Sequence, residues 1–244
     1  MLQRIFAHAL AASLFVAAAA AQADEASVKK AFLAKFPKAT VETVTKLKDL
    51  PLYEIVIPRS GEPVIIYTDE AFSFIMQGNV IDNKTGADLT EQKKNKLTAI
   101  DFDSLPLDKA IKKVKGTGAR KVAVFTDPDC PFCKRIEQEF EKMNDVTVYL
   151  FLFPIEQLHP KARQRAKAIW CSPNRLKAWD DYVLRGVLPT AAGDCDNPVD
   201  ALIELGQSKG INATPTLVFA DGSKVPGALN SSQLEQQLTA AGNK

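Results

Sequence analysis

The stretch KVAVFTDPDCPFCKRIEQEFEKM, residues 121–143, constrains the fold of this chain most strongly. Its first part is an apolar run typical of a buried strand, and a Cys-x-x-Cys pair then opens a segment with Ile136, Phe140 and Met143 at helical spacing. A strand that turns directly into a helix puts Cys130 on the first helical turn. A pair with this spacing can be a redox dithiol, half of a zinc site or a structural disulfide.

The first 23 residues indicate the compartment. MLQRIFAHALAASLFVAAAAAQA has one Arg near its start, an apolar run and an Ala-Gln-Ala cleavage site, which is the pattern of a secretory signal peptide. A retained anchor is the weaker interpretation, because the apolar run is well short of the roughly 20 residues that a membrane span needs. Removal of residues 1–23 leaves an exported chain of 221 residues, 244 minus 23, in surroundings where disulfides persist.

Composition excludes several kinds of function. Residues 24–244 keep 30 of the 31 basic residues, since Arg4 is removed, and all 29 acidic ones, so their net charge is near +1. This balance predicts no nucleic-acid partner and no membrane-surface partner. The same residues hold a single histidine, His159, which excludes a three-histidine metal site. We expect His159 to have a surface or capping role, since no cysteine partner for it is evident in the sequence.

The chain changes its pattern between residues 83 and 110. Before this segment, Val28, Phe32 and Phe36 predict an amphipathic helix. Turn residues then separate four runs that are typical of strands, at residues 39–47, 51–58, 62–69 and 72–82. About 65 residues make a thin core, so we expect the domain over residues 24–88 to need a partner surface.

A Lys-rich connector over residues 89–115 follows this domain. Its sparse apolar residues predict two helices, and the second carries Leu107, Ile111 and Val114 and ends at Gly116. We interpret the connector as a solvated helical surface rather than as a site.

From residue 116 the pattern alternates between strands and helices. The first strand and the Cys-x-x-Cys helix are followed by a nearly all-apolar strand at residues 145–154, helical segments, a hairpin around Asp221-Gly222 and a last helix. The order βαβ, helical insertion, ββα is that of a thioredoxin fold. The expected fold class is therefore α/β, with a C-terminal thioredoxin fold that carries a helical insertion.

In this fold the Cys130 sulfur lies among unpaired backbone N–H groups at the positive end of a helix. These groups lower the thiol pKa from about 8.5 into a range of roughly 3.5 to 7.5. Pro131 suits the helix start because its missing N–H has no partner there. Cys133, one turn further on, is positioned to attack a mixed disulfide formed by Cys130. The carboxylates of Asp127 and Asp129 oppose the lowering of the pKa, although either can instead cap the helix.

The other two cysteines, Cys171 and Cys195, are 24 residues apart. Four cysteines allow three connectivities, and in an exported protein we favour a pair of Cys130 with Cys133 and a pair of Cys171 with Cys195. The second pair is expected to be structural, with a contribution on the order of 3 to 4 kcal/mol in the chain-entropy model. A four-cysteine zinc site is the rival, but such sites usually use two closely spaced pairs.

A Thr214-Pro215 step precedes the apolar run TLVFA. Alone it reads as an ordinary turn proline. After a strand, Cys-x-x-Cys and helix unit it instead suggests the cis proline that faces the active-site sulfurs in thioredoxin folds. Such a proline leaves the backbone groups before it free to pair with an extended substrate strand.

FTDPDCPFCKR, KAIWC, Cys195 and ATPTLVFADGSKVPG together resemble the DsbC/DsbG family of periplasmic thiol:disulfide interchange proteins, over nearly all of residues 24–244. The resemblance implies an α+β, cystatin-like dimerisation domain over residues 24–88, a linker helix region over 89–115 and a catalytic domain over 116–244. It also implies the site residues, which are the catalytic Cys130 and Cys133, the active-site dipeptide Pro131 and Phe132, the cis-proline loop Thr214 and Pro215, and the structural disulfide Cys171 and Cys195.

The implied function is that of a periplasmic protein disulfide isomerase with chaperone activity, which rearranges or reduces incorrect disulfides in exported proteins. The family implies a homodimer and the membrane reductase DsbD as electron donor, and we expect no cofactor, metal or nucleic acid. The Pro131-Phe132 dipeptide is closer to the Pro-Tyr of the DsbG branch than to the Gly-Tyr of the DsbC branch. A DsbG-like reductase of oxidised single cysteines, a DsbA-like net oxidant and a holdase chaperone therefore stay as alternatives. Val124 replaces the buried carboxylate of cytosolic thioredoxins, which argues against a plain reductase.

Overall fold

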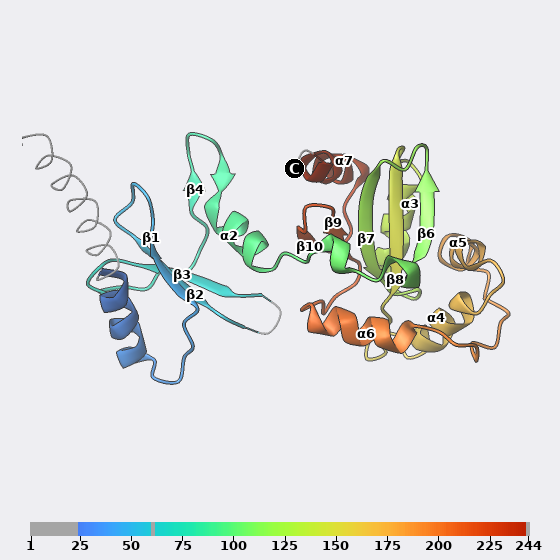
Figure 1. Cartoon of the computed structure of the whole chain (residues 1–244), viewed down its shortest axis with the longest axis horizontal. Coiled ribbons are helices and arrows are strands. Elements are labelled where there is room, and N and C mark those ends of the chain that lie inside the picture. The colour runs from blue at the N-terminus through green and yellow to red at the C-terminus, as the bar shows by residue number, and fades with distance from the viewer. Residues whose placement is uncertain (1–23, 60–61, 243–244) are drawn as a thin grey trace, which may run out of the picture. The chain divides into compact units, whose positions relative to one another are not determined.

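The computed structural model describes residues 24–59 and 62–242. Its contacts divide the chain into two compact units, Met1–Leu97 and Thr98–Lys244 (Figure 1). The signal-peptide prediction falls on residues 1–23, outside the described residues. In the described part of the chain, none of the helices is both long and apolar enough to cross a membrane.

The first unit is built on an antiparallel sheet of three strands. In sheet order the strands are β1 (Thr43–Lys46), β2 (Tyr53–Ile57) and β3 (Val64–Thr68). A helix over residues 24–35 covers one face, where Val28 and Phe32 are buried in a cluster with Ile55. On the other face, α2 (Leu89–Leu97) packs its last residue against Val56. Side chains on both faces of the sheet are therefore covered within this unit.

The prediction of a fourth strand at residues 72–82 is wrong over most of its length. Asp69 accepts hydrogen bonds from the backbone N–H and hydroxyl of Ser73, at 2.7 and 2.5 Å, and Phe72 has a positive φ of 52°. These local bonds turn the chain, so its apolar residues meet β3 at one bridge, between Tyr67 and Met76. The strand character is confined to the short pair β4 (Ile81–Asp82) and β5 (Ala87–Asp88).

The second unit has a five-stranded mixed sheet in the order β10-β9-β7-β8-β6. Its strands are β6 (Ile111–Lys115), β7 (Arg120–Thr126), β8 (Val146–Leu152), β9 (Thr216–Phe219) and β10 (Lys224–Pro226). Its helices are α3 (Pro131–Phe140), α4 (Ala162–Trp170), α5 (Arg175–Arg185), α6 (Val199–Ser208) and α7 (Ser231–Gly242). The strands β7 and β8 are parallel, and the other neighbours are antiparallel. This is the predicted thioredoxin fold with α4, α5 and α6 inserted between β8 and β9.

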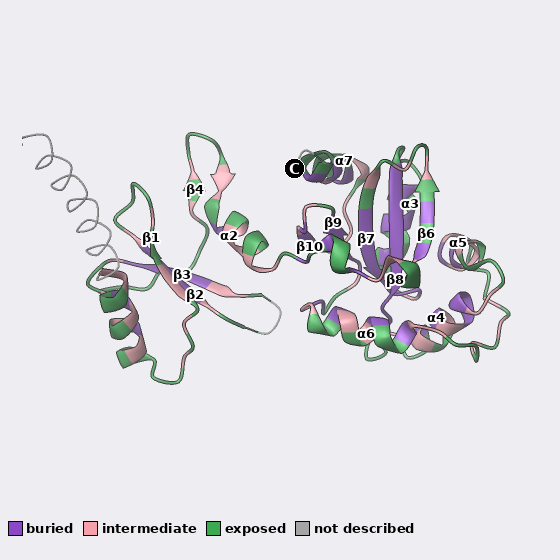
Figure 2. Cartoon of the chain, in the orientation of Figure 1, coloured by how far each residue is buried: buried purple, intermediate pink, exposed green. Residues whose placement is uncertain are grey.

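The core of this unit lies on both faces of the sheet. Side chains of α3, α4, α5 and α7 pack with one set of strand residues, which includes Val124, while α6 contributes Leu202 to the other set, which includes Phe125, and Val199 to the first. The central strands are consequently buried along most of their length, and every residue of β8 is buried (Figure 2). Burial on both faces explains the continuous apolar run that the sequence shows there.

The expected second helix of the connector is wrong, because residues 111–115 form β6. Ile111 and Lys113 are buried, whereas Lys112 and Val114 are exposed, so burial alternates with the period of a strand. β6 pairs antiparallel with β8 along its whole length. A spacing of three between Ile111 and Val114 also fits the period of a helix. Pairing with the edge of β8 makes this segment a strand instead. The thioredoxin fold therefore begins before residue 116.

Candidate active site

The Cys-x-x-Cys pair lies where the sequence predicts it. β7 ends at Thr126, a short turn follows, and Cys130 is the extended N-cap residue of α3, with Pro131 at the first helical position. The backbone N–H of Cys130 donates to the carbonyl of Asp127 at 3.2 Å, which closes the turn. Both cysteines are free thiols, and Cys130 is 5% exposed while Cys133 is fully buried.

A loop far along the chain meets these sulfurs. The Cys130 thiol lies 3.4 Å from the carbonyl oxygen of Thr214, and the Thr214-Pro215 peptide bond is cis, as the resemblance implies. The Cys133 sulfur accepts a hydrogen bond from the backbone N–H of Asp127 at 3.4 Å. The fold thus brings the first cysteine and the Thr-Pro loop together across 84 residues of sequence.

The two thiols differ sharply in acidity. A hydrogen bond from the Cys133 thiol contributes most to lowering the pKa of Cys130 to about 5. Burial opposes this effect, and the backbone N–H groups of Cys133 and Phe132 at the start of α3 support it. Burial raises the pKa of Cys133, and the hydrogen bond to Cys130 raises it further. At neutral pH the outer sulfur is therefore a thiolate and the inner one stays protonated.

Asp127 does not cap the helix. Its side chain is fully buried, and its carboxylate accepts hydrogen bonds from the N–H of Asp129 at 2.8 Å and of Ile155 at 2.7 Å. The same carboxylate lies 3.0 Å from Nδ1 of His159. The residue whose backbone contacts both cysteines therefore carries a carboxylate that is bound by the segment following β8.

Asp129 does not cap the helix either, since α3 has no side-chain cap. Its carboxylate contacts the guanidinium of Arg165 on α4 at 2.5 Å and accepts the hydroxyl hydrogen of Tyr182 on α5 at 2.7 Å. Burial, with the hydrogen bond to Asp129 second, raises the pKa of Tyr182 to about 12. The residue before Cys130 is thereby fixed to the helical insertion.

His159, expected to have a surface or capping role, is instead a partner of the active-site turn. Its side chain is 22% exposed. Burial lowers its pKa, but the hydrogen bond to Asp127 and the negative charges of Asp127 and Cys130 outweigh burial, so the net shift is upward. Sequence reasoning missed this role because Asp127 and His159 lie 32 residues apart, on different elements. The one available signal was that His159 follows the strand next to the Cys-x-x-Cys strand.

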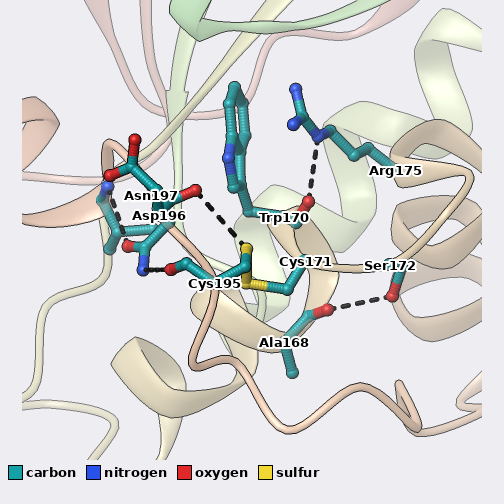
Figure 3. Close-up of a disulfide and its surroundings, with 9 residues drawn as sticks. Ala168, Trp170, Cys171, Ser172, Arg175, Cys195, Asp196 and Asn197 are labelled. Carbon is teal, nitrogen blue, oxygen red and sulfur yellow. Dashed lines mark hydrogen bonds between the residues drawn. A yellow bond between two sulfur atoms is a disulfide. The ribbon is translucent and has the colours of Figure 1, made fainter.

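The Cys171–Cys195 disulfide is present with a sequence separation of 24, which confirms that pairing (Figure 3). It joins the C-terminal end of α4 to the chain before α6. The Arg175 guanidinium stacks 3.7 Å from the Trp170 ring centroid beside it and donates to the Trp170 carbonyl at 2.9 Å. The bond removes two of the four sulfurs from the rival zinc site, and the described residues contain no group of three or more His, Cys, Asp and Glu side chains that could hold a metal.

A thiolate at a helix start, a protonated thiol one turn behind it and a facing Thr-Pro loop define a thioredoxin-fold thiol:disulfide oxidoreductase. Residues 107–242 match the thioredoxin-like domain family, and residues 19–91 match the disulfide bond isomerase protein N-terminal domain.

Relatives identify the family more closely. The probable thiol:disulfide interchange protein DsbC of Bordetella pertussis is 39% identical over 217 residues, which cover 89% of this chain and 74% of the relative. The thiol:disulfide interchange protein DsbC of Salmonella typhimurium is 29% identical over 230 residues, with 93% and 91% covered. A crystal structure of a disulfide interchange protein from Neisseria gonorrhoeae is 52% identical with a TM-score of 0.55, and the match covers 57% of this chain and 99% of that chain. The chain belongs to the DsbC family of thiol:disulfide interchange proteins.

Proposed function

We propose that this protein is a periplasmic disulfide isomerase that attacks incorrect disulfides of exported proteins through Cys130. The observation that carries the proposal is the difference in acidity between the two thiols. The Cys130 thiolate attacks one sulfur of a substrate disulfide, which forms a mixed disulfide and releases the other substrate sulfur as a thiolate. A second substrate thiolate can then displace Cys130, so the substrate disulfide is rearranged and no electrons are gained or lost overall.

Reduction is the competing outcome. Cys133 must lose its proton and attack the mixed disulfide, which releases a fully reduced substrate and leaves a Cys130–Cys133 disulfide. The raised pKa of Cys133 keeps its sulfur protonated at neutral pH, so this step is slow unless a base removes the proton. The arrangement therefore favours rearrangement over reduction. After each reduction, the membrane reductase DsbD, which the family implies, returns two electrons to the pair.

The surface around Cys130 suits unfolded substrates. Phe132 is 51% exposed beside Cys130, and the Arg135 guanidinium lies 5.2 Å from its ring centroid. We assign the Pro131-Phe132 dipeptide to contact with apolar substrate segments. The backbone next to Pro215, at Thr214, would hold an extended substrate strand near the sulfur.

The first unit is proposed to join two copies of the chain. Its match to the disulfide bond isomerase N-terminal domain supports this role, and so does its small size. Phe74, Ile75 and Met76 are large apolar side chains that stay exposed within it. Apolar surface held by a dimer would also supply the proposed chaperone activity, and the predicted signal peptide supports a periplasmic location.

The proposal is tested by replacing each cysteine separately. Cys133→Ser should accumulate mixed disulfides with exported proteins in the periplasm, because the attack by Cys133 that releases a stalled substrate is then lost, whereas Cys130→Ser should form none. Both variants are trapped with acid and a maleimide and compared on non-reducing gels. Mixed disulfides through residue 133 in the Cys130→Ser variant would contradict the assignment.

Two further results separate the alternatives. In wild-type cells the Cys130–Cys133 pair should be mostly reduced beside an oxidised Cys171–Cys195 pair, and a mostly oxidised active site would instead indicate a net oxidant. In a refolding assay with a scrambled disulfide substrate, wild-type protein should restore activity and the double Cys130→Ser, Cys133→Ser variant should not. Suppression of aggregation by the double variant would show a holdase chaperone activity that does not need the cysteines.

A further inference from the structure

Asp127 connects the active-site sulfurs to a titratable side chain behind them. Its backbone N–H donates to the Cys133 sulfur at 3.4 Å, and its carbonyl accepts the N–H of Cys130 at 3.2 Å. Its carboxylate is buried and lies 3.0 Å from Nδ1 of His159. A change of charge on His159 is therefore transmitted to a residue that contacts both cysteines.

The contacts of the carboxylate determine where the imidazole titrates. An ionised carboxylate only accepts hydrogen bonds, as it does from the backbone N–H groups of Asp129 and Ile155, so its contact with Nδ1 requires a hydrogen on that nitrogen. Nδ1 then keeps its hydrogen in the neutral and the protonated ring alike, and the second proton binds at Nε2. The hydrogen bond to Asp127 survives titration, and what changes is the charge.

The charges that face His159 come from two elements. Asp127 and Asp129 lie on the turn after β7, and Cys130 lies at the start of α3. The charge of Asp129 is matched by Arg165 of α4, while Tyr182 of α5 donates a hydrogen bond to it. Arg165 thus compensates Asp129, and His159 is the ionisable group on the Asp127 carboxylate.

We propose that His159, held by Asp127, is a positioning residue that stabilises the Cys130 thiolate, so that protonation of this ring and ionisation of this thiol favour each other. With a neutral ring, the buried negative charge of Asp127 is uncompensated and disfavours the nearby thiolate. With a protonated ring, the two side chains together are neutral and the repulsion is removed. The inference rests on the proposed role of Cys130 as the attacking thiol.

Coupling of this kind must be reciprocal. If the imidazolium favours the thiolate, the thiolate must raise the proton affinity of the ring by the same factor. The pKa of His159 is raised in this dithiol structure, and the charge of Cys130 is one of the causes. Formation of a Cys130–Cys133 disulfide abolishes the thiolate, so it should lower the proton affinity of His159.

The first test is an NMR titration of the His159 ring in the reduced and oxidised wild-type protein, purified after export. The signal is assigned by its absence from a His159→Asn variant. Oxidation should lower the proton affinity of the ring by about three- to tenfold. A reduced Cys130→Ala variant, which has no thiolate, should titrate like the oxidised protein. Equal midpoints in the reduced and oxidised wild-type protein would overturn the inference, and this comparison needs no substituted protein.

The second test measures iodoacetamide alkylation of Cys130 against pH, with the modified residue located by mass spectrometry. Asn at position 159 keeps an N–H donor for Asp127 but cannot carry a charge. The His159→Asn variant should react about three- to tenfold more slowly than wild type near pH 4.5, where the thiolate fraction is limiting. Arg163→Gln is the matched control, because it removes a positive charge from the start of α4, shortly after His159 in the chain. That charge is paired with Glu156 and Asp200, so its loss should leave the pH profile of Cys130 alkylation unchanged.

The outcomes separate this inference from the proposed function. If wild-type Cys130 shows no alkylation below neutral pH, it is not a low-pKa nucleophile and the proposed function fails. If wild-type Cys130 reacts at low pH and the His159→Asn variant has the same profile, the role of His159 is wrong and the proposed function stands.

Discussion

Cys130 and Cys133 carry the same thiol group in different surroundings. Cys130 is the N-cap residue of a helix, only 5% exposed and with hydrogen-bond donors directed at its sulfur, while Cys133 is one turn inside and fully buried. The position of this pair at the start of a helix could be predicted from the sequence, because it depends on residues close by in the chain. The partners His159, Arg165 and Tyr182 were not readable, because the fold brings them from elements 32 to 53 residues away from the aspartates that they contact.

The acidity of Cys130 predicts how the stability of the reduced protein depends on pH. Its pKa is about 5 in the folded protein and near 8.5 in an unfolded chain. Folding therefore favours the thiolate, and this contribution is present above about pH 8.5, is lost as the pH falls and is absent below about pH 5. Relative to Cys130→Ser, reduced wild-type protein should gain on the order of 2–4 kcal/mol of unfolding free energy between pH 4.5 and 8.5.

Urea denaturation at several pH values measures this difference. The Cys171–Cys195 disulfide must stay intact, which mass spectrometry verifies. Comparison with the Ser variant cancels the contributions of the titrating groups that do not interact with Cys130. A stability difference that is the same at pH 4.5 and 8.5 would show that folding does not favour the Cys130 thiolate.

At the scale of elements, β6 shows where periodicity misleads. Lys113 would be unexpected inside a sheet, yet its ammonium is buried 2.7 Å from a Glu137 carboxylate oxygen of α3 and 2.7 Å from an Asp180 oxygen of α5. These charges raise the pKa of Lys113 against the lowering effect of its burial. The cluster joins β6, α3 and α5. A sequence analysis that treats every Lys as solvent-exposed does not predict the two carboxylates that pair with Lys113.

Removal of one member of this cluster should destabilise the fold strongly. Lys113→Met leaves the fully buried Glu137 carboxylate without its cation, and we expect a loss of about 3–5 kcal/mol of unfolding free energy. Lys113→Met with Glu137→Leu should cost clearly less than Lys113→Met alone, because the second change removes the fully buried one of the two carboxylates left without a cation. Urea denaturation midpoints of both proteins test this. A double variant less stable than the single variant would contradict the electrostatic explanation.

At the scale of the molecule, the class of the second unit was predictable because its strands and helices carry strong local patterns in the order of a thioredoxin fold. The first unit was predicted less well. Its run at residues 72–82 is apolar enough for a strand, but the hydrogen bonds of Asp69 to Ser73 turn the chain there. The buried cluster that contains Val28 and Phe32 lies within the first unit, and the cluster that contains Val124 and Ile136 lies within the second.

Separate cores predict that the two units can be separated. A chain that starts at Thr98 should fold and should keep the alkylation profile of Cys130, because all the contacts of that sulfur lie within the second unit. It should be a monomer and lose most isomerase activity if the first unit joins two copies. Sedimentation, alkylation and the scrambled-substrate assay measure the three properties. A truncated protein with an altered Cys130 profile would show that the first unit contributes to the active site.

The Cys171–Cys195 disulfide ends the helix that carries Arg165, and Arg165 holds the residue before Cys130. If the chain is exported as proposed, the active-site turn depends on a covalent bond that each new copy has yet to make. Four cysteines can pair in three ways, so an immature copy in which Cys195 has joined Cys130 is a misoxidised exported protein. On the proposed function, such a copy is a substrate for a correctly folded copy. The protein would then correct wrong disulfides in newly made copies of itself.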